Sequence, residues 1–251
     1  MIIGMVRYSI PNVFGDTENS RNLIQLYEEP YFSIRLNIFK NITLKSFNQQ
    51  TNKNFILLVY HTSMIPDNKR KLFDNIEKEY RFVKNIYIDD IKMNIPDEFK
   101  NEKICTFRID NDDGIAVDFI EKLQKAKDIY QDNTVISISH ANKICRISEN
   151  DYRIASFNNI SNSMGLAYLS NNNKTIMDLG QHQLIPKRFK IEVLDGNGGL
   201  QVINNYNVAN SFKSRSKLKT FTLNYYDMKK HLIEENYGNL DISCLPILCE
   251  K

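Results

Sequence analysis

Short apolar runs alternate with amphipathic segments through the first 140 residues, and this alternation restricts the fold more than any other feature. Five runs have strand length: Met1–Val6, Phe55–Tyr60, Val83–Ile88, Ile104–Ile109 and Thr134–Ser139. Apolar side chains recur at helical spacing over four segments: 35–47, 67–80, 116–130 and, near the end, 224–235. Strands and helices in this order form crossover units. The sequence therefore predicts an α/β fold with a central, mostly parallel sheet flanked by helices.

The second half of the chain lacks this alternation. Residues 158–173 are rich in asparagine and serine, and Asp195–Gly199 has the composition of a flexible turn. No internal repeat or long linker separates independent units, so we expect one domain over residues 1–251. Within it, residues 1–140 are expected to bind a nucleotide, and residues 141–251 to hold a second substrate.

The composition is that of a globular protein, with 42% hydrophobic and 25% charged residues. A net charge of +3 is too small to indicate a nucleic-acid-binding protein. The apolar start lacks the features of a signal peptide, and no run reaches the roughly 18 apolar residues of a membrane span. We therefore expect a cytoplasmic protein. No Cys-x-x-Cys pair is present, so free thiols are expected at Cys105, Cys145, Cys244 and Cys249.

The apolar run Ile104–Ile109 ends in three carboxylates, those of Asp110, Asp112 and Asp113, and a helical pattern follows at once. Carboxylates this close repel one another, so a folded chain keeps them together with water or a cation between them. Mg²⁺ and Mn²⁺ prefer carboxylate oxygens and share their remaining coordination positions with substrate phosphates. Because ligands gather at the carboxyl ends of strands in α/β sheets, this cluster predicts a metal that bridges to a phosphorylated substrate.

Simpler interpretations of the acidic cluster stay open at this point. Asp113 could cap the helix that follows, and the pair Asp113-Gly114 could form a turn. A calcium-binding loop requires glycine at its sixth position, where this chain has Ile115, so calcium ranks below both.

Five segments occur in a characteristic order: Val6-Arg-Tyr-Ser9, Arg35-Leu-x-x-Phe39, Leu44-Lys-Ser-Phe-Asn-Gln-Gln-Thr51, Asn54-Phe-Ile-Leu-Leu-Val59 and Phe107-Arg-Ile-Asp-Asn-Asp-Asp113. Together they resemble the rhamnosyltransferase family, bacterial glycosyltransferases of the A-type (GT-A) fold that are associated with capsule and lipopolysaccharide assembly. The resemblance covers mainly residues 5–125 and returns at Leu200-Gln-Val-Ile203 and Asn207.

The resemblance implies a Rossmann-like nucleotide-diphospho-sugar transferase fold. It also implies an Asp-x-Asp motif that holds Mn²⁺ or Mg²⁺ on the diphosphate of a nucleotide sugar. On that pattern Asp112 is the direct metal ligand, and Asp110 binds the metal or the nucleotide ribose. Asp113 supports the site through water or capping. Arg7, which follows the first apolar run, could reach the nucleotide or its diphosphate.

Two further arginines are expected to have structural roles. Arg35 lies at the start of a predicted helix, and Arg108 precedes the acidic cluster and is expected to pair with it.

The chain departs from the family pattern around Leu200–Ile203, where tryptophan would precede and histidine would follow. Here those positions hold Gly199 and Asn204. The resemblance implies that the histidine position supplies a third metal ligand. A carboxamide oxygen is a weaker ligand than imidazole for Mn²⁺, so Asn204 would weaken metal binding, favour Mg²⁺ or mark an enzyme that depends little on metal. His182 could take the ligand role instead.

Activation of the acceptor is less well defined. An inverting transferase needs a general base near the acceptor hydroxyl, and Asp178, Glu192 and Asp195 lie in the expected half of the chain. The basic stretch Lys213–Lys230 could be a solvated face, or it could contact anionic lipid that presents a lipid-linked acceptor.

These observations predict a glycosyltransferase that is cytoplasmic and could be peripheral at the inner membrane. It would transfer a sugar from a nucleotide-diphosphate donor to a saccharide acceptor in cell-surface polysaccharide or lipopolysaccharide synthesis. Two alternatives remain. One is a degenerate glycosyltransferase fold that binds saccharide or a partner enzyme. The other is a metal-dependent nucleotidyl- or phosphoryltransferase.

Overall fold

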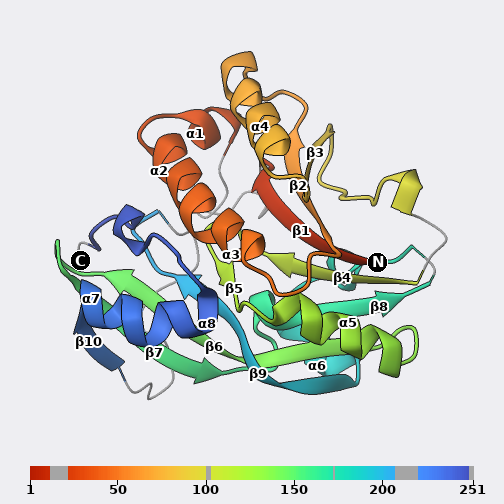
Figure 1. Ribbon diagram of the computed structural model, residues 1–251. Helices are drawn as coiled ribbons and strands as arrows, with labels where there is room; N and C mark the ends of the chain where they lie inside the picture. Colours follow the sequence, from red (N-terminus) through yellow and green to blue (C-terminus); the bar gives the residue numbers. More distant parts are fainter. Residues whose placement is uncertain (12–21, 100–102, 172, 207–219, 249–251) are drawn as a thin grey trace.

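The computed structural model describes residues 1–11, 22–99, 103–171, 173–206 and 220–248 (Figure 1). Its strands are β1 (Ile2–Ser9), β2 (Ile56–Thr62), β3 (Val83–Ile88), β4 (Ile104–Ile109), β5 (Gly114–Ile115), β6 (Val135–Arg146), β7 (Asp151–Asn158), β8 (Leu166–Ser170), β9 (Ile191–Val202) and β10 (Thr220–Asn224). They form one sheet in the order β10-β7-β6-β8-β4-β1-β2-β3, with β9 beside β6 and β5 beside β9. Strands and helices alternate along the first half, so the predicted α/β class is confirmed.

The first-half strands form the parallel part of the sheet. β1 lies between β2 and β4, and β3 extends the sheet beyond β2. Met5 in β1 lies beside Leu58 on one side and Arg108 on the other. All four strands run in the same direction, so their carboxyl ends meet at one edge. In α/β sheets, ligands bind at this edge.

The prediction of a mostly parallel sheet is wrong for the second half. β8 lies between β4 and β6 and is antiparallel to both. β7 and β10 continue the sheet beyond β6 in antiparallel fashion, while β9 pairs with β6 in parallel. Antiparallel neighbours need only short connections, which explains how this half builds its strands without a long crossover helix between each pair.

Helices cover one face of the parallel strands: α1 (Leu23–Tyr27), α2 (Tyr31–Ile38), α3 (Lys45–Asn48), α4 (Asp67–Glu79) and α5 (Phe119–Ile129). Their apolar side chains share a core with Val6, Leu57 and Phe107 of the sheet. The opposite face is covered by shorter elements: the 3₁₀ turns η4 (Ile176–Leu179) and η5 (His182–Leu184), and α6 (Ile185–Arg188). The prediction that helices flank the sheet is therefore confirmed on one face. On the other face short turns take the place of long helices.

The helical run predicted over 35–47 begins four residues earlier and contains a change of pitch. It consists of α2, the π-helical segment η1 (Phe39–Leu44) and α3, without a break in chain direction. Arg35 therefore lies inside a helix and not at its start. π-Helical segments often occur near functional sites, and this one lies beside the residues that follow Asp113.

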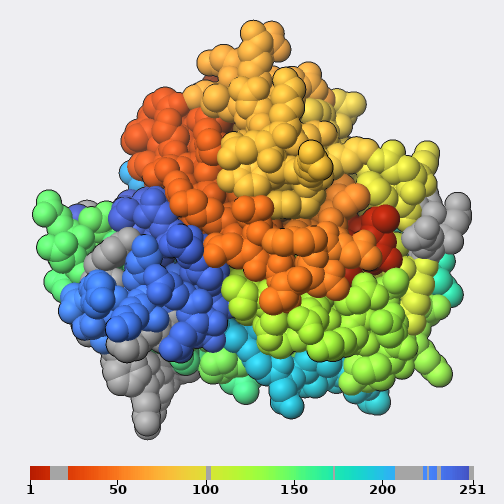
Figure 2. Space-filling model, in the orientation of Figure 1, coloured from red at the N-terminus to blue at the C-terminus, as the bar shows by residue number. Residues whose placement is uncertain are grey.

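A third core cluster joins the end of the chain to this helical run. The predicted last helix consists of α7 (Tyr225–Met228), the π-helical segment η6 (Lys229–Ile233) and α8 (Glu234–Tyr237). Figure 2 shows this segment, in blue, packed beside the orange helical run. Tyr237 is fully buried, and its hydroxyl donates to the Gly199 backbone oxygen at 2.8 Å. The C-terminal helices thereby pack against β9.

The predicted flexible turn at Asp195–Gly199 is wrong, because these residues belong to β9. The strand carries register shifts opposite His140, and Gly196 has a φ of 93°. A Cβ on Gly199 would lie 2.9 Å from the Gly114 backbone oxygen. The glycines of this segment therefore allow β9 to lie close to the neighbouring backbone. Glycine-rich composition alone does not distinguish such a strand from a turn.

Two composition-based expectations can be compared with the fold. Cys105 and Cys145 are buried free thiols and Cys244 is a half-buried one, whereas Cys249 lies outside the described residues. None of the helices in the described ranges has the length and apolar character that a membrane crossing requires.

Candidate functional site

The acidic turn, Asp110–Asp113, follows β4 at the carboxyl edge of the parallel strands, beside the end of β1. Asp110 and Asp112 are half-buried, whereas Asp113 has no exposed surface. The three carboxylates therefore differ in their surroundings. Two of them lie at the ligand edge, and the third is part of the protein interior.

Asp113 fastens the acidic turn to the end of β9. Its Oδ1 accepts a hydrogen bond from the Val202 amide at 3.0 Å, and its backbone oxygen accepts one from Thr43 Oγ1 at 2.8 Å. Burial raises the pKa of the Asp113 carboxyl well above its usual range, and the neighbouring Asp112 and Asp110 add to the effect. It does not cap α5, whose N-cap residue is Asp118. In this position Asp113 links the acidic turn to β9.

Three buried polar side chains of the helical run, Thr43, Ser46 and Gln50, hold the backbone that follows the acidic turn; we call them the helix clamp. Ser46 Oγ accepts a hydrogen bond from an amide of β5 at 3.2 Å. Gln50 Nε2 donates to the Ala116 oxygen at 2.8 Å, and its Oε1 accepts from the Ile120 amide at 3.0 Å. These bonds fix the path of the chain between β4 and α5.

Arg35 holds the acidic turn from the end of β1. Its guanidinium carbon lies 4.8 Å from the ring centroids of both Tyr8 and Tyr31. It donates hydrogen bonds to the Tyr8 backbone oxygen and to the carboxamide oxygen of Asn111. Asn111 is the buried residue between Asp110 and Asp112. These contacts agree with the structural role expected for Arg35.

Arg7 and Arg108 lie on the face of the sheet that η4 and η5 cover. Met5 is beside Arg108 in the β1–β4 register, and side chains alternate along a strand, so Arg7 shares the face of Arg108. Thr106, two residues before Arg108, accepts a hydrogen bond from the Ile176 amide of η4 at 2.8 Å. The two arginines are therefore neighbours between the sheet and the short turns.

The expected electrostatic pairing of Arg108 with the acidic cluster is found with Asp110, but without a direct contact in the part of the chain that the structure describes. Its side chain is only 8% exposed and makes no hydrogen bond or ion pair there. Burial and the charge of Arg7 lower the pKa of Arg108 to about 10, and Asp110 acts in the opposite direction. Arg108 stays charged at neutral pH in a nearly buried position.

His182 in η5 lies within the field of the same charges. Its Nδ1 is 2.7 Å from the Ser161 backbone oxygen, so Nδ1 carries the proton and Nε2 is left as an acceptor. Burial lowers the pKa of His182 while the Ser161 bond raises it, and the nearby Arg108 and Asp110 act in opposite directions. A neutral imidazole next to Asp110 is chemically suited to the ligand role that the sequence suggested.

The donor set fits a metal completed by substrate better than one enclosed by protein. Among the described residues, no three or more His, Cys, Asp or Glu side chains form a group that could hold a metal ion. Asp110 and Asp112 supply two carboxylates at the edge, and phosphate oxygens commonly supply the other ligands of Mg²⁺. Asn204 is buried two residues beyond Val202, and its Oδ1 accepts from the Tyr206 amide at 2.8 Å.

The three predicted bases lie in different surroundings. Asp178 Oδ2 accepts hydrogen bonds from the Thr175 amide at 2.7 Å and from its hydroxyl at 3.0 Å, so this carboxylate caps η4. Asp195 is an exposed residue of β9.

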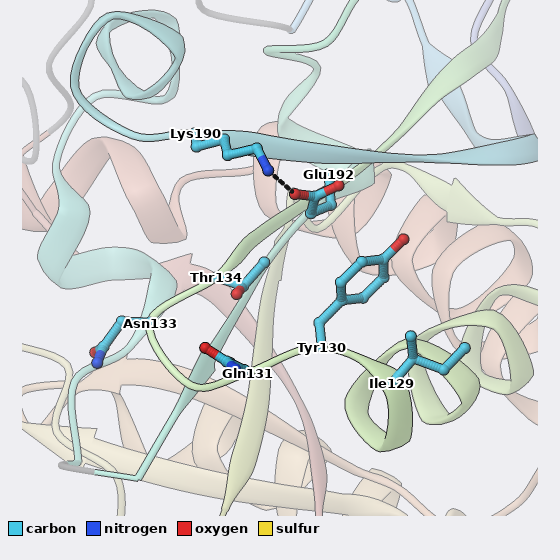
Figure 3. A pocket seen from close by; sticks show the side chains of 7 residues that line it. All are labelled: Ile129, Tyr130, Gln131, Asn133, Thr134, Lys190 and Glu192. Carbon is cyan, nitrogen blue, oxygen red and sulfur yellow. Dashed lines mark ion pairs between the residues drawn. The ribbon is translucent and has the colours of Figure 1, made fainter.

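Glu192 lies in a separate surface pocket of about 410 Å³. Figure 3 shows its carboxylate paired with Lys190 and facing the ring of Tyr130; the Lys190–Glu192 ion pair is 2.8 Å long. β8 and β6 separate β9 from β4, so Glu192 lies about 14 Å to the side of β4 at ordinary strand spacing.

Comparison with protein families identifies the chain. The family described as "Putative rhamnosyl transferase" matches residues 1–216, and the chain belongs to this family. A search of curated proteins gives no significant match.

Solved structures with a similar fold include S. aureus TarS 1–349 in complex with UDP (11% identity, TM-score 0.47) and in complex with UDP-GlcNAc (10% identity, TM-score 0.49). The alignments cover 81% and 84% of this chain. They span about three fifths, 60% and 61%, of the TarS chains.

Sequence reasoning missed the helix clamp and Asn111. The signal for the clamp was present, because Thr43, Ser46 and Gln50 recur at spacings of three and four on the buried side of an amphipathic helix. Small polar residues on an apolar face require partners, and the sequence alone does not say where those partners are.

Proposed function

We propose that the chain is a glycosyltransferase that uses a nucleotide-diphosphate sugar and transfers the sugar to a saccharide acceptor. Membership of the rhamnosyl transferase family supports the reaction class. The observation that carries the proposal is the position of Asp110 and Asp112 at the carboxyl edge of β4, in a turn whose Asn111 accepts from Arg35 and whose Asp113 accepts from Thr43 and the Val202 amide. Such a site binds a phosphorylated ligand through a cation without rearranging the loop.

The described residues suggest how the donor would be held. Asp112 would bind Mn²⁺ or Mg²⁺ directly, and Asp110 would bind the metal or the ribose. A bound divalent cation would neutralise the negative charge that develops on the departing nucleoside diphosphate. Arg7, at the end of the neighbouring strand, would contact the nucleotide or its diphosphate. His182 would supply a third metal ligand through Nε2 in place of the family histidine that Asn204 replaces.

The setting of the reaction follows from the resemblance and forms part of the proposal. A transferase of cell-surface polysaccharide or lipopolysaccharide synthesis would act on the cytoplasmic side and could meet a lipid-linked acceptor at the inner membrane. The basic stretch Lys213–Lys230 could contact anionic lipid at that membrane. Its first part, residues 213–219, lies outside the described residues.

Calorimetric titration tests the donor site. UDP, dTDP, GDP and CMP would each be titrated with Mn²⁺, with Mg²⁺ and with EDTA, first into the wild type and then into Asp112→Ala. Asp128→Asn, an exposed carboxylate on α5, is the matched control. We expect one nucleotide to bind more tightly with metal, and this gain to be lost in Asp112→Ala alone. If no nucleotide bound under any condition, the transferase proposal would fail and the degenerate binding protein would replace it.

A further inference from the structure

The side chain of Arg108 is nearly buried and forms no ion pair with the residues that the structure describes. It is 8% exposed, and among the described residues its guanidinium makes no hydrogen bond either. Burying a charge is costly unless it is paired, because an isolated charge in the interior is strongly destabilising. The charge of Asp110 offsets part of this cost, but the hydrogen-bond donors of the guanidinium are left for a ligand.

Arg7 repeats this arrangement on the adjacent strand. It shares the face of Arg108, it is half-buried, and its guanidinium also makes no hydrogen bond or ion pair within the described ranges. Two like charges held on neighbouring strands repel each other unless an anion lies between them. Asp110 is the acidic group whose charge acts on Arg108, and it compensates one of the two positive charges.

The loop that η5 contacts holds one neutral donor without a partner among the described residues. His182 contacts Ser161 through Nδ1, which brings η5 against the loop that precedes β8. In the same loop, Asn162 is 5% exposed, and its Nδ2 is a buried donor that has no partner in the part of the chain described. The 3₁₀ turn η3 (Ser163–Gly165) that follows packs on β4. An oxygen-rich anion would satisfy such donors, whereas an apolar ligand would leave them unpaired.

We propose that Arg7 and Arg108 form a phosphate-binding site that recognises a phosphoryl group directly, without a metal. Guanidinium groups bind phosphate through paired hydrogen bonds and keep their charge at any physiological pH. The two arginines and Asp110 together carry one net positive charge. A phosphoryl group with two negative charges would exceed it, so a cation at Asp112 would strengthen binding without being required for it.

The identity of the natural ligand rests on the proposed function. The phosphoryl group would belong to the diphosphate of the donor or to a phosphorylated acceptor, and both present the same chemistry to the two arginines. The site itself does not depend on that function, because it is defined by the buried, unpaired guanidinium.

Titration of inorganic pyrophosphate in EDTA tests the site. Binding to the wild type is expected, with an affinity at least tenfold weaker in both Arg7→Gln and Arg108→Gln. Arg188→Gln, which removes an exposed positive charge from α6 on the same face, should bind like the wild type. Thermal unfolding of each variant shows whether it is folded. Should Arg108→Gln fail to fold, Arg7→Gln still decides the question. No binding of pyrophosphate to the wild type in EDTA, or an affinity equal to that of the wild type in the folded variants, would overturn the proposal.

Competition distinguishes the source of the phosphoryl group and separates this proposal from the transferase proposal. If the donor diphosphate occupies the site, a nucleoside diphosphate displaces pyrophosphate in EDTA. If a phosphorylated acceptor occupies it, pyrophosphate binds alongside the nucleotide. Pyrophosphate binding without any nucleotide binding would support the anion site and reject the transferase. Metal-dependent nucleotide binding together with no pyrophosphate binding in EDTA would reject the anion site alone.

Discussion

Replacing Gln50 with methionine should destabilise the protein, although the two side chains have similar length and volume. Gln50 is 2% exposed and joins the helical run to the Ala116 oxygen at 2.8 Å and the Ile120 amide at 3.0 Å. Methionine fills the space but leaves the Ile120 amide buried and unpaired, whereas the Ala116 oxygen keeps its hydrogen bond from the Phe119 amide at 3.0 Å. An unpaired buried group costs about 1–3 kcal/mol, so we expect the free energy of unfolding to fall by about that amount.

Chemical denaturation of Gln50→Met and of the matched variant Gln124→Met would measure this loss. Gln124 lies on α5, where its amide makes an exposed, long contact of 3.3 Å to Asp128, so its replacement should change stability by less than about 0.5 kcal/mol. If Gln50→Met were as stable as Gln124→Met, the helix clamp would not hold the chain after the acidic turn. Nucleotide affinity should fall with Gln50→Met as well, because the same bonds position Asp112.

Three further predictions concern stability. Asp113→Asn keeps an acceptor for the Val202 amide and should resemble the wild type in urea denaturation, whereas Asp113→Ala should lose about 1–3 kcal/mol; equal losses would contradict the bond. A methyl group on Gly199 would lie 2.9 Å from the Gly114 oxygen, so Gly199→Ala should lower the unfolding free energy by about 1–3 kcal/mol, and an unchanged midpoint would show that β9 can shift. Burial lowers the pKa of His61 to about 3, below its unfolded value near 6.5, so stability should decline as pH falls below 6.5, by about 2 kcal/mol at pH 5. His61→Leu should remove that part of the pH dependence, and identical profiles would reject it.

The sequence located the parallel strands well because their signal is local. β3 and β4 have the predicted bounds, since each is a segment of strand-like composition that ends at an aspartate, and α4 follows Pro66 as predicted. β8 was missed because it is five residues long and lies inside an Asn- and Ser-rich stretch. Its place between β4 and β6 depends on pairing with residues more than 25 positions away.

The candidate site was predictable only in part for the same reason. The acidic turn is visible as a change from apolar to acidic residues within one segment. The burial of Asp113 and its bond to Val202, 89 positions away, are tertiary facts. Arg108 interacts with the neighbouring Asp110 through charge, as its position in the sequence suggested, but side-chain alternation also places it on the sheet face beside Arg7. The second neighbour follows from strand pairing and not from sequence proximity.

The nucleotide product that is released from a sugar donor is the most direct test of the proposed glycosyl transfer. The wild type and Asp112→Ala would be incubated with UDP-, dTDP-, GDP- and CMP-linked sugars, with Mn²⁺ or Mg²⁺ and a mixture of saccharide acceptors. The products would be resolved by anion-exchange chromatography. We expect the wild type to release a nucleoside diphosphate from one of the diphosphate-linked sugars, as a glycosyl transfer requires. We expect no such release from Asp112→Ala. Release of pyrophosphate from nucleoside triphosphates in a parallel reaction, with no nucleoside diphosphate from any sugar donor, would contradict the proposed transfer and identify a nucleotidyltransferase.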